Sequence, residues 1–524
     1  MLAVFARKAS GLTKEASLLD AFLFGFMNNG IGVTLWNVHS WTYFTFPGGN
    51  LILASIITAF LTIFGVALAW GILGGSMPRS GGDYIYNSRI LHPAVGTATS
   101  WAQGLFTMTA WIWILAPWVA NPGIPVLAGT LGIPLETVEF WTTPIGMLIV
   151  ASVINVLSFI IVVSGFKIYL IIQRTLFLIG MIGLIIAFVL LSMVTRESFT
   201  SIWNAIAAQY GSPSFEETIA LAKEAGYVKT TWDWVATLGM VPTVTWALSY
   251  GFCIGYIGGE VKRPERNILG AQIIAALVPS FFCAWLGYLL QNKLGYEFAH
   301  AIAYIDNEGP EWYAMPFPPT YANLAAILTN NIILKFLIGI NFILFDFIWI
   351  PISYLIFARV LFAQGMDQIG PRWFTDLHPR FNTPVKLYVL ELILGEAAII
   401  HYCFFPEVLG GLSITGLDAL TVWGILGISV MLFPFVKKVR HIWEASPHRW
   451  RKTAVMSGIL SLILVGIVIW AIYTSPAMGG LNIVWTPIYI LVGVAGISWY
   501  YFWKWKRSKE GIDVTLAFKE LPPE

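Results

Sequence analysis

Long apolar runs recur from one end of this 524-residue chain to the other. A helix needs about 20 predominantly apolar residues to cross the ~30 Å hydrocarbon core of a bilayer, where backbone polar groups can be satisfied only internally. Twelve stretches meet this requirement: residues 19–46, 51–73, 95–119, 145–163, 169–193, 235–258, 268–290, 324–362, 385–404, 412–435, 454–473 and 483–503. The sequence therefore predicts an all-α integral membrane protein with twelve transmembrane helices.

The composition supports the bilayer as the main solvent. Charged residues make up 11% of the chain and hydrophobic residues 57%, whereas soluble proteins average ~25% charged residues. This excludes most soluble enzymes, and a net charge of +2 gives no field that would attract nucleic acid. The three cysteines, Cys253, Cys283 and Cys403, lie inside apolar runs without a CxxC pattern, so no zinc site or disulfide framework is predicted. We expect no metal and no cofactor.

The placement of Lys and Arg predicts the orientation of the chain. If the N-terminus is cytosolic, 25 of the 30 basic residues fall on the cytosolic side, four fall outside and Lys335 lies within the eighth span. Cytosolic loops of membrane proteins carry this excess. We expect a multi-pass protein of the cell membrane with both termini cytoplasmic, in the segments 1–18 and 506–524, and with no removable signal peptide. The oligomeric state is left open.

The longest outer loop, residues 195–234, carries a helix-start pattern. Ser214 and Glu217 have the spacing of a capping box, in which each side chain bonds the backbone of the other. The pattern predicts a short helix that ends near residues 224–226. Two interpretations of this loop are open: it forms a lid over the transport path, or it simply covers the helix bundle.

Small and polar residues interrupt the first and sixth predicted spans, at Asn28-Asn29-Gly30-Ile31-Gly32 and at Ser249-Tyr250-Gly251-Phe252. Non-helical backbone at membrane depth is tolerated only where it is buried or lines a cavity, so such interruptions indicate binding sites. The two lie five helices apart, and an odd offset makes those helices run in opposite directions. The spacing predicts a five-plus-five inverted repeat, residues 19–194 and 235–436, followed by two helices within 451–505.

Broken helices offer chemically distinct ends. A half-helix N-terminus presents amides that suit a carboxylate, and the opposite end presents carbonyls that suit an ammonium group or a metal cation. An α-amino acid carries both a carboxylate and an ammonium group. The two interruptions therefore favour a small-molecule amino acid or amine as the ligand.

Three cytosolic stretches carry a family resemblance. MPRSGGDYIYNSRILHPAVGTATSW (Met77–Trp101), GEVKRPERNILGA (Gly259–Ala271) and ARVLFAQGMDQIGPRWFTDLHPRFNTPV (Ala358–Val385) resemble, in order, motifs of the amino acid-polyamine-organocation transporters. The resemblance covers roughly residues 15–505. It implies a LeuT-like architecture and secondary transport by alternating access, in which helices 1, 2, 6 and 7 rock against helices 3, 4, 8 and 9. It also implies that the chain is not an enzyme.

The resemblance also implies a binding site. Amides of Gly30-Ile31-Gly32-Val33 would hold a carboxylate, backbone near Ser249–Gly251 would hold an ammonium group, and Trp246 would form an aromatic lid. With a buried acid of the eighth span added, the predicted substrate-binding residues are Asn29, Gly30, Ile31, Gly32, Trp246, Ser249, Tyr250, Gly251, Phe252 and Asp346.

The chain departs from the family pattern at three positions. Ile31 stands where a small Ser or Thr is usual, and Cys253 stands where many relatives have a Glu. Gly180 stands where proton-coupled relatives have a Lys. The resemblance therefore gives no support for a lysine-based proton mechanism.

Four acids are candidates for a position inside the hydrocarbon: Asp346, Glu391, Glu396 and Asp418. An acid at the bilayer centre costs about 2.5–3.5 kcal/mol on insertion scales, so each needs a partner, a proton or a role. Asp346 and Ser353, seven residues apart on one helix face, are candidates for coupling to H⁺ or Na⁺; for Ser353 a bond to its own i−4 carbonyl is the structural alternative. Asp418 is a candidate outer-gate residue, and Glu391 and Glu396 are expected in interhelical bonds.

Several functions stay open at this point. The sequence favours a secondary transporter of amino acids or related organic amines, either a symporter or an exchanger, with polyamines or other organic cations as alternative substrates. The rival is a membrane sensor that keeps the binding site and does not transport. Charged residues near the cytosolic ends are candidates for the ion pairs of an inner gate, with ordinary solvated loops as the alternative: Arg79, Asp83, Glu260, Lys262, Arg263 and Asp367.

Overall fold

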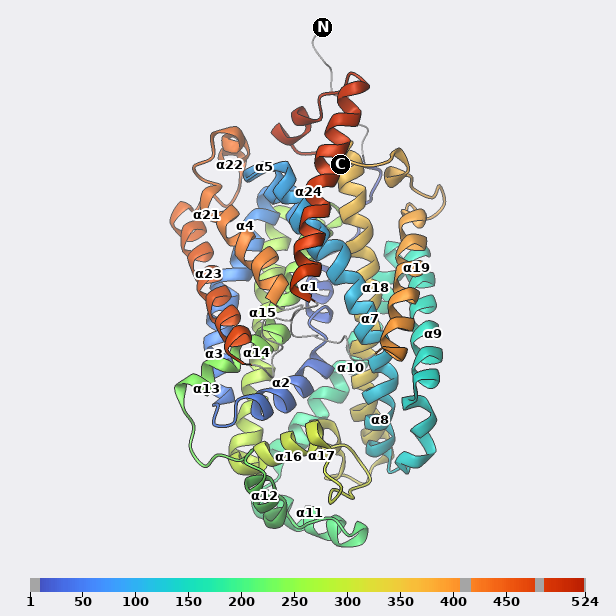
Figure 1. Cartoon of the computed structure of the whole chain (residues 1–524), viewed down its shortest axis with the longest axis vertical. Coiled ribbons are helices and arrows are strands. Elements are labelled where there is room, and N and C mark those ends of the chain that lie inside the picture. Colours follow the sequence, from blue (N-terminus) through green and yellow to red (C-terminus); the bar gives the residue numbers. More distant parts are fainter. Residues whose placement is uncertain (1–9, 406–415, 476–484, 523–524) are drawn as a thin grey trace.

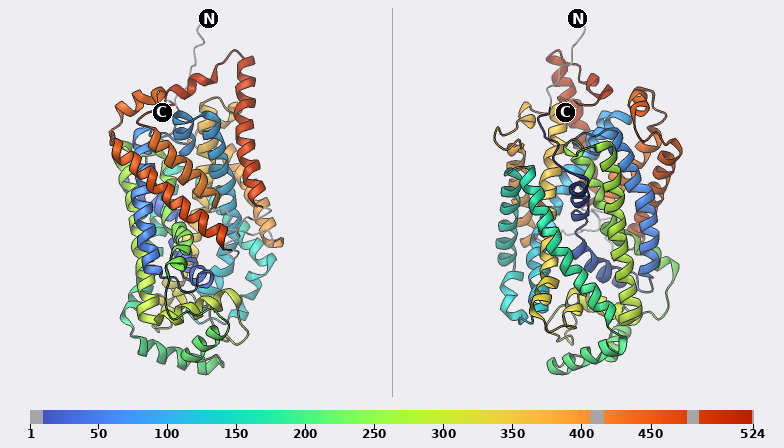
Figure 2. Two further views of the ribbon diagram at one scale, coloured as in Figure 1. Left: turned by 60° about the vertical axis from the view of Figure 1, so that its left-hand side comes forward. Right: turned by 180° about the vertical axis from the view of Figure 1, so that it is seen from behind.

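The computed structural model describes residues 10–405, 416–475 and 485–522. Within these ranges the regular structure is helical, and the β pairing consists of two isolated bridges, Ala16 with Val261 and Ser80 with Ile257. The long helices run along the long axis of the molecule (Figures 1 and 2). The predicted all-α class is thus confirmed.

The first predicted span is broken into α1 (Leu18–Met27) and α2 (Ile31–Thr45). Helix α1 begins at a capping box between Ser17 and Asp20. It ends because Gly30 takes a left-handed conformation, with a φ of 53° that residues with a Cβ rarely adopt. The predicted interruption is therefore present as a gap between two helices.

The second to fifth spans follow in order. Their helices are α3 (Leu51–Leu61), η1 (Thr62–Ala67) and α4 (Leu68–Ser76); α6 (Pro93–Ser100), η2 (Trp101–Thr107), α7 (Met108–Trp118), η3 (Val119–Gly123) and α8 (Ile124–Leu131); α9 (Pro144–Val163); and α10 (Phe166–Met193). The segments η1, η2 and η3 are π-helical, and such turns are frequent at functional sites. Between spans lie α5 (Asp83–Ile90) and the 3₁₀ segment η4 (Leu135–Thr142).

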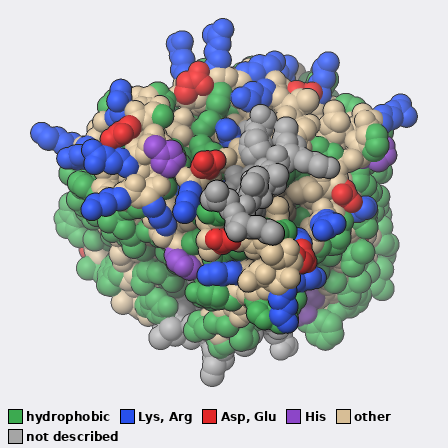
Figure 3. All heavy atoms as spheres, turned by 90° about the horizontal axis from the view of Figure 1, so that it is seen from above, with side chains coloured by type: hydrophobic (Ala, Val, Ile, Leu, Met, Phe, Trp, Pro, Cys, Tyr) green, Lys and Arg blue, Asp and Glu red, His purple; other side chains and the backbone are tan. Residues whose placement is uncertain are grey.

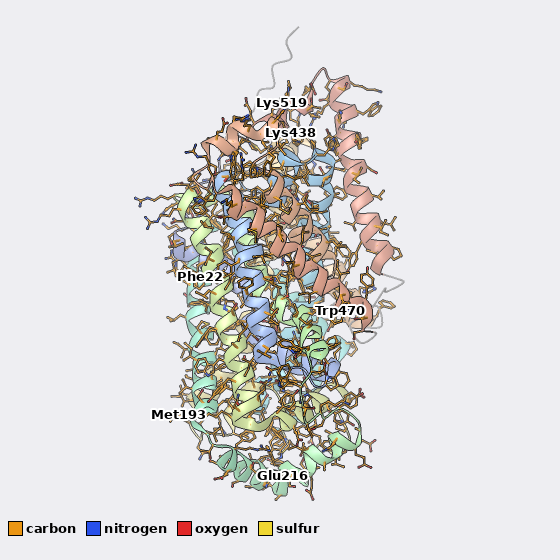
Figure 4. The ribbon with its side chains drawn as sticks, turned by 90° about the vertical axis from the view of Figure 1, so that its left-hand side faces the viewer. Phe22, Met193, Glu216, Lys438, Trp470 and Lys519 are labelled. Carbon is orange, nitrogen blue, oxygen red and sulfur yellow. The ribbon has the colours of Figure 1, made fainter. Side chains whose placement is uncertain are left out.

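The long loop after α10 forms α11 (Arg196–Tyr210) and α12 (Phe215–Glu224). The capping box of Ser214 and Glu217 is present, as predicted. Figure 4 shows Glu216 of this loop at one end of the molecule and Lys438 and Lys519 at the other. The loop thus covers the end opposite the basic residues.

The second half begins with another broken span, α13 (Trp234–Gly239) and α14 (Val241–Ser249) followed by the 3₁₀ segments η5 (Tyr250–Tyr256) and η6 (Gly258–Glu260). The next elements are α15 (Pro264–Tyr288), η7 (Leu289–Gly295), α16 (Tyr296–Glu308), α17 (Tyr321–Ala326), α18 (Ile332–Met366), η8 (Arg372–Thr375) and α19 (Val385–Phe404). The last are η10 (Ala419–Ile425), α21 (Leu426–Leu432), η11 (Lys437–Val439), α22 (Arg440–Ala445), α23 (Arg451–Thr474), α24 (Trp485–Lys509) and η13 (Val514–Lys519).

The number of spans in the described residues is lower than the sequence predicts. Ten helices are long and apolar enough to cross a membrane, and an eleventh is added if the bent pair 416–432 and 437–445 counts as one span. The predicted span 324–362 also begins later, because Asn331 caps α18 with its side chain and leaves α17 as a separate short helix. The twelve-span count stays a prediction.

The long helices pack in two groups. Helices α1, α3, α4, α14 and α15 pack on one another, and α7, α9, α18 and α19 form the second group. Large apolar side chains such as Ile56, Phe60, Leu178, Phe281 and Ile393 are exposed on the outer flank. An apolar surface of this extent is typical of contact with lipid.

The first and the last described residues of the chain lie at the same end of the molecule. The Arg79 side chain donates a hydrogen bond to the backbone oxygen of Pro522, and the backbone oxygen of Ala16 accepts one from Lys262. Lys and Arg side chains are numerous on this end (Figure 3). The arrangement agrees with an even number of spans; its cytosolic orientation stays a prediction.

Candidate functional site

The two predicted interruptions contact each other in the middle of the molecule. The Asn29 amide group accepts a hydrogen bond from the backbone N–H of Tyr250 at 2.9 Å and donates one to the backbone oxygen of Ala275 at 3.2 Å. The Asn28 amide donates to the backbone oxygen of Tyr250 at 3.0 Å. The two asparagines thus connect the break in the first span to the break in the sixth. Their side chains hydrogen-bond backbone groups that have no partner within a regular helix.

The predicted ligand-binding backbone lies at these breaks. Helix α2 begins at Ile31, so the amides of Ile31 and Gly32 occupy the positive end of a 15-residue helix. Across from it, α14 ends at Ser249 and the chain continues as a 3₁₀ helix through Gly251 and Phe252. All of these residues are buried. The two helix ends are therefore shielded from solvent in this structure.

The glycines of the first break are required by close packing with α18. A Cβ on Gly30 would overlap the Trp349 ring, and a Cβ on Gly32 would lie 2.8 Å from the Phe345 ring. Real Cβ atoms do not approach other atoms so closely. These two positions therefore hold α18 directly against the start of α2.

Tryptophan rings cover the breaks. Trp246 stacks between Trp41 and Trp111, with ring centroids 5.5 Å from each. Trp111 in turn lies 5.1 Å from Trp349 and 5.5 Å from Tyr250. The sequence predicts Trp246, whereas the others carry no local signal that separates them from the remaining tryptophans among the 24 in the chain.

Asp346 is completely buried, and neither of its carboxylate oxygens has a hydrogen-bond partner among the described residues. It lies on α18 one turn from Phe342 and one turn from Trp349, hence on the same helix face. Phe342 packs on Trp36 of α2, and Trp349 packs on Trp111 of α7. The structure thus brings Asp346 to the aromatic side of the site.

Ser353, two turns beyond Asp346 on α18, donates a hydrogen bond to the backbone oxygen of Trp349 at 3.4 Å. This i−4 bond is the structural alternative that the sequence suggests for Ser353. A role for Ser353 in ion coupling stays a prediction.

Asp418 is buried beside the sixth-span break. Its carboxylate accepts a hydrogen bond from the Tyr250 hydroxyl at 2.5 Å and one from the Thr107 hydroxyl at 3.1 Å. A second π-helical segment joins the site through Thr62 of η1, whose hydroxyl is 2.9 Å from that of Ser249. The sequence does not predict Thr62 and Thr107 as site residues; an outer-gate role for Asp418 stays a prediction.

The other two acids of the spans form the expected interhelical bonds. Glu391 of α19 accepts from the Thr109 hydroxyl of α7 at 3.0 and 3.2 Å. Glu396 accepts from Ser152 and Asn155 of α9 at 2.9 and 3.0 Å. These bonds hold the second helix group together and lie apart from the two breaks.

Buried ion pairs lie at the basic end. Glu260 and Arg359 form two hydrogen bonds of 2.7 and 2.9 Å, and Asp367 pairs with Arg89 at 2.7 Å. The sequence singles out Glu260 and Asp367 as gate candidates, but not their arginine partners. These partners lie 99 and 278 residues away along the chain.

Asp83, between two spans at the same end, accepts a hydrogen bond from the Tyr256 hydroxyl at 2.7 Å. Burial raises the pKa of Asp83 to about 6, and the bond from Tyr256 offsets only part of this. The residue therefore gains or loses its charge near neutral pH while joining α5 to the end of η5.

The described residues contain no group of three or more His, Cys, Asp or Glu side chains that could hold a metal ion.

Comparisons with known proteins agree with this architecture. A family model described as amino acid permease matches residues 18–497. No curated protein sequence matches the chain. Among solved structures, that of MhsT in complex with L-phenylalanine is similar to this chain at a TM-score of 0.52 and 16% identity, over 86% of this chain and 98% of MhsT. At this identity the likeness concerns the fold alone.

Proposed function

The chain belongs to the amino acid permease family, and we propose on this premise that it carries an amino acid or a related organic amine across the cell membrane by alternating access. It is a transporter and not an enzyme. The observation that carries the proposal is the buried contact between two broken helices, with Asn28 and Asn29 on one and Tyr250 on the other. Broken helices at the core of a repeat fold are where such transporters bind substrate.

The proposed architecture has twelve spans, ten of them in a five-plus-five inverted repeat and two beyond it. The two breaks support it, since they occur in the first and sixth spans. The packing also supports it, because one helix group contains α1, α3, α4, α14 and α15 and the other contains α7, α9, α18 and α19. Rocking of the first group against the second would expose the breaks to each side in turn.

The proposed substrate is recognised by three features. The N-terminal amides of α2 suit a carboxylate, and backbone carbonyls near Ser249 suit an ammonium group. Trp246 and its neighbouring rings suit an apolar or aromatic side chain. MhsT, which shares the fold, was solved with L-phenylalanine. An amino acid with a large apolar side chain is therefore our first candidate.

Asp346 supports a second candidate, a polyamine or other organic cation. A carboxylate that is buried with no hydrogen-bond partner in the described part of the chain is costly unless a ligand or a proton neutralises it. A second ammonium group, placed between Phe342 and Trp349, would fill this role and gain cation–π contact. Asp346 and Ser353 are also our candidates for coupling to H⁺ or Na⁺.

Counterflow in proteoliposomes tests the proposal. Vesicles loaded with unlabelled L-phenylalanine or putrescine should take up the same labelled compound, and binding without counterflow or uptake would instead support the sensor function. Asp346→Asn should abolish putrescine binding if the cation lies there and should leave L-phenylalanine binding largely intact. Glu391→Gln is the matched control, because Glu391 is also a buried acid but bonds Thr109, away from the breaks.

A further inference from the structure

Two π-helical segments meet at Asp418. Thr107 is the last residue of η2, Asp418 is the residue that precedes η10, and the two segments contact each other. A π-helical turn widens a helix and disturbs its hydrogen bonds, which is why such turns recur at functional sites. The hydrogen bond from Thr107 to Asp418 joins the two segments directly.

The described surroundings of Asp418 are polar but contain no cation. The hydroxyls of Tyr250 and Thr107 donate hydrogen bonds to it, and the titratable groups near enough to interact with its charge include Tyr256, whose hydroxyl bonds Asp83, and Tyr489. Among the residues that the structure describes, no Lys, Arg or His side chain forms an ion pair with Asp418. Since a buried carboxylate without a cation is costly, a proton is the simplest group that can neutralise it.

Thr107 can serve both protonation states of Asp418. Its hydroxyl oxygen lies 3.1 Å from Asp418 Oδ1 and 3.0 Å from the backbone oxygen of Ala102. When Asp418 is ionised, Thr107 donates to the carboxylate. When Asp418 is protonated, Thr107 accepts its proton in a hydrogen bond and donates to Ala102 instead. Tyr250 donates to the other oxygen, Oδ2, in both states.

Tyr250 connects this acid to the substrate site. Its hydroxyl bonds Asp418, its backbone N–H bonds Asn29 and its backbone oxygen accepts from Asn28. A movement of α1 or η5 on substrate binding would therefore change the hydrogen bonding of Asp418. Within the described ranges, Asp346 has no hydrogen-bond partner to transmit such a change, and Glu391 bonds only Thr109.

We propose that Asp418 is the proton-binding residue of this transporter: it takes up a proton on the side where substrate enters and releases it on the other side. Tyr250 couples the hydrogen bonding of Asp418 to the arrangement of the two broken helices. This inference rests on the transport function proposed above. The step forms and breaks one O–H bond on the carboxylate and exchanges the proton with water, so no further reactant is needed.

The test uses the full chain in proteoliposomes with a panel of the proteinogenic L-amino acids and putrescine. A compound that shows counterflow at equal pH should accumulate in wild-type vesicles that are alkaline inside, and a trapped pH dye should report acidification during uptake. Asp418→Asn, which keeps the shape and cannot titrate, should lose accumulation by tenfold or more and lose the acidification, with a smaller effect on counterflow. Glu391→Gln should retain both.

Tyr250→Phe is the second variant, in case Asp418→Asn does not insert correctly. It removes one of the two hydroxyl donors that stabilise the ionised Asp418, so the pH of half-maximal uptake should move toward alkaline values. An unchanged pH profile in Tyr250→Phe, or gradient-driven accumulation retained by Asp418→Asn, would overturn the proposal.

Failure of the inference and failure of the proposed function give different results. No counterflow of any panel compound in the wild type would contradict transport itself. Counterflow without a response to the pH gradient, or accumulation driven by a sodium gradient alone, would leave transport standing and overturn the role of Asp418.

Discussion

Arg359 and Glu260 form a buried bidentate ion pair at the basic end of the molecule, between α18 and η6, 99 residues apart in the chain. The Arg359 guanidinium also donates to the Tyr388 hydroxyl of α19. The pair therefore joins the end of the first helix group to the second group at the place where an inner gate is expected.

Replacing one partner of this ion pair should lower the stability of the protein more than replacing both partners. Glu260→Gln leaves the Arg359 charge buried without its partner, a change that typically costs about 3–5 kcal/mol. Glu260→Met combined with Arg359→Met should recover much of that stability. Thermal unfolding of the purified protein measures both. Asp376→Asn is the control, because its pair with Lys386 is exposed and exposed pairs contribute about 0–1 kcal/mol. Equal losses of stability in Glu260→Gln and Asp376→Asn would contradict the stabilising role of the buried pair.

Gly30→Ala should strongly reduce uptake. A Cβ at Gly30 would overlap the Trp349 ring, and the left-handed backbone adds about 1–2 kcal/mol of strain. Gly132→Ala separates the two effects, because Gly132 has a φ of 72° and no described atom lies within 4 Å of the place that its Cβ would take. Its uptake should stay near wild type. Equal uptake by both variants would show that contact with Trp349 does not matter.

Asn29→Ala should loosen the sixth-span break. The change leaves the backbone N–H of Tyr250 and the oxygen of Ala275 without the Asn29 amide, and each buried unsatisfied group costs about 1–3 kcal/mol. Hydrogen–deuterium exchange of the peptide Tyr250–Tyr256 should rise. Asn292→Ala is the control, since Asn292 is exposed and bonds Tyr288, four residues before it. Unaltered exchange in Asn29→Ala would contradict the clamp.

Sequence patterns predict this fold well where the signal is local. Apolar runs locate the long helices, the glycines and asparagines near residue 30 locate the first break, and Ser214 with Glu217 locates the loop helix. The late start of α18 also has a local signal that the apolar pattern hides, because Asn331 is a good N-cap.

Contacts between distant residues are not predictable from the same patterns. Tyr250 and Asp418 are 168 residues apart, and nothing in either segment selects the other. The π-helical turns depend on packing between helices, since their sequences, such as WAQGLFT, resemble ordinary helix. The stack of Trp41, Trp111 and Trp246 is not predictable from the sequence for another reason. Tryptophans are so common in this chain that composition cannot single out three of them.

Asp83 should make stability depend on pH between about 4 and 6. Its pKa is about 6 in the folded protein, because burial raises it, and 3.8 in the unfolded chain. The folded state therefore binds the proton more tightly, so the stabilising effect is complete below about pH 4 and is lost as the pH rises through about 6. Thermal unfolding in detergent should show this fall in the wild type, and Asp83→Asn should flatten it.

Glu217 provides a control of opposite sign for Asp83. The Ser214 hydroxyl and backbone of the capping box hold the pKa of Glu217 below its usual value of 4.5. Its contribution is therefore present above pH 4.5 and is lost as the pH falls, which is the reverse of the Asp83 effect. Glu217→Gln should leave the loss of stability between about pH 4 and 6 in place, or make it slightly steeper. If Asp83→Asn keeps the wild-type slope, titration of the buried Asp83 carboxyl does not cause the loss of stability in this pH range.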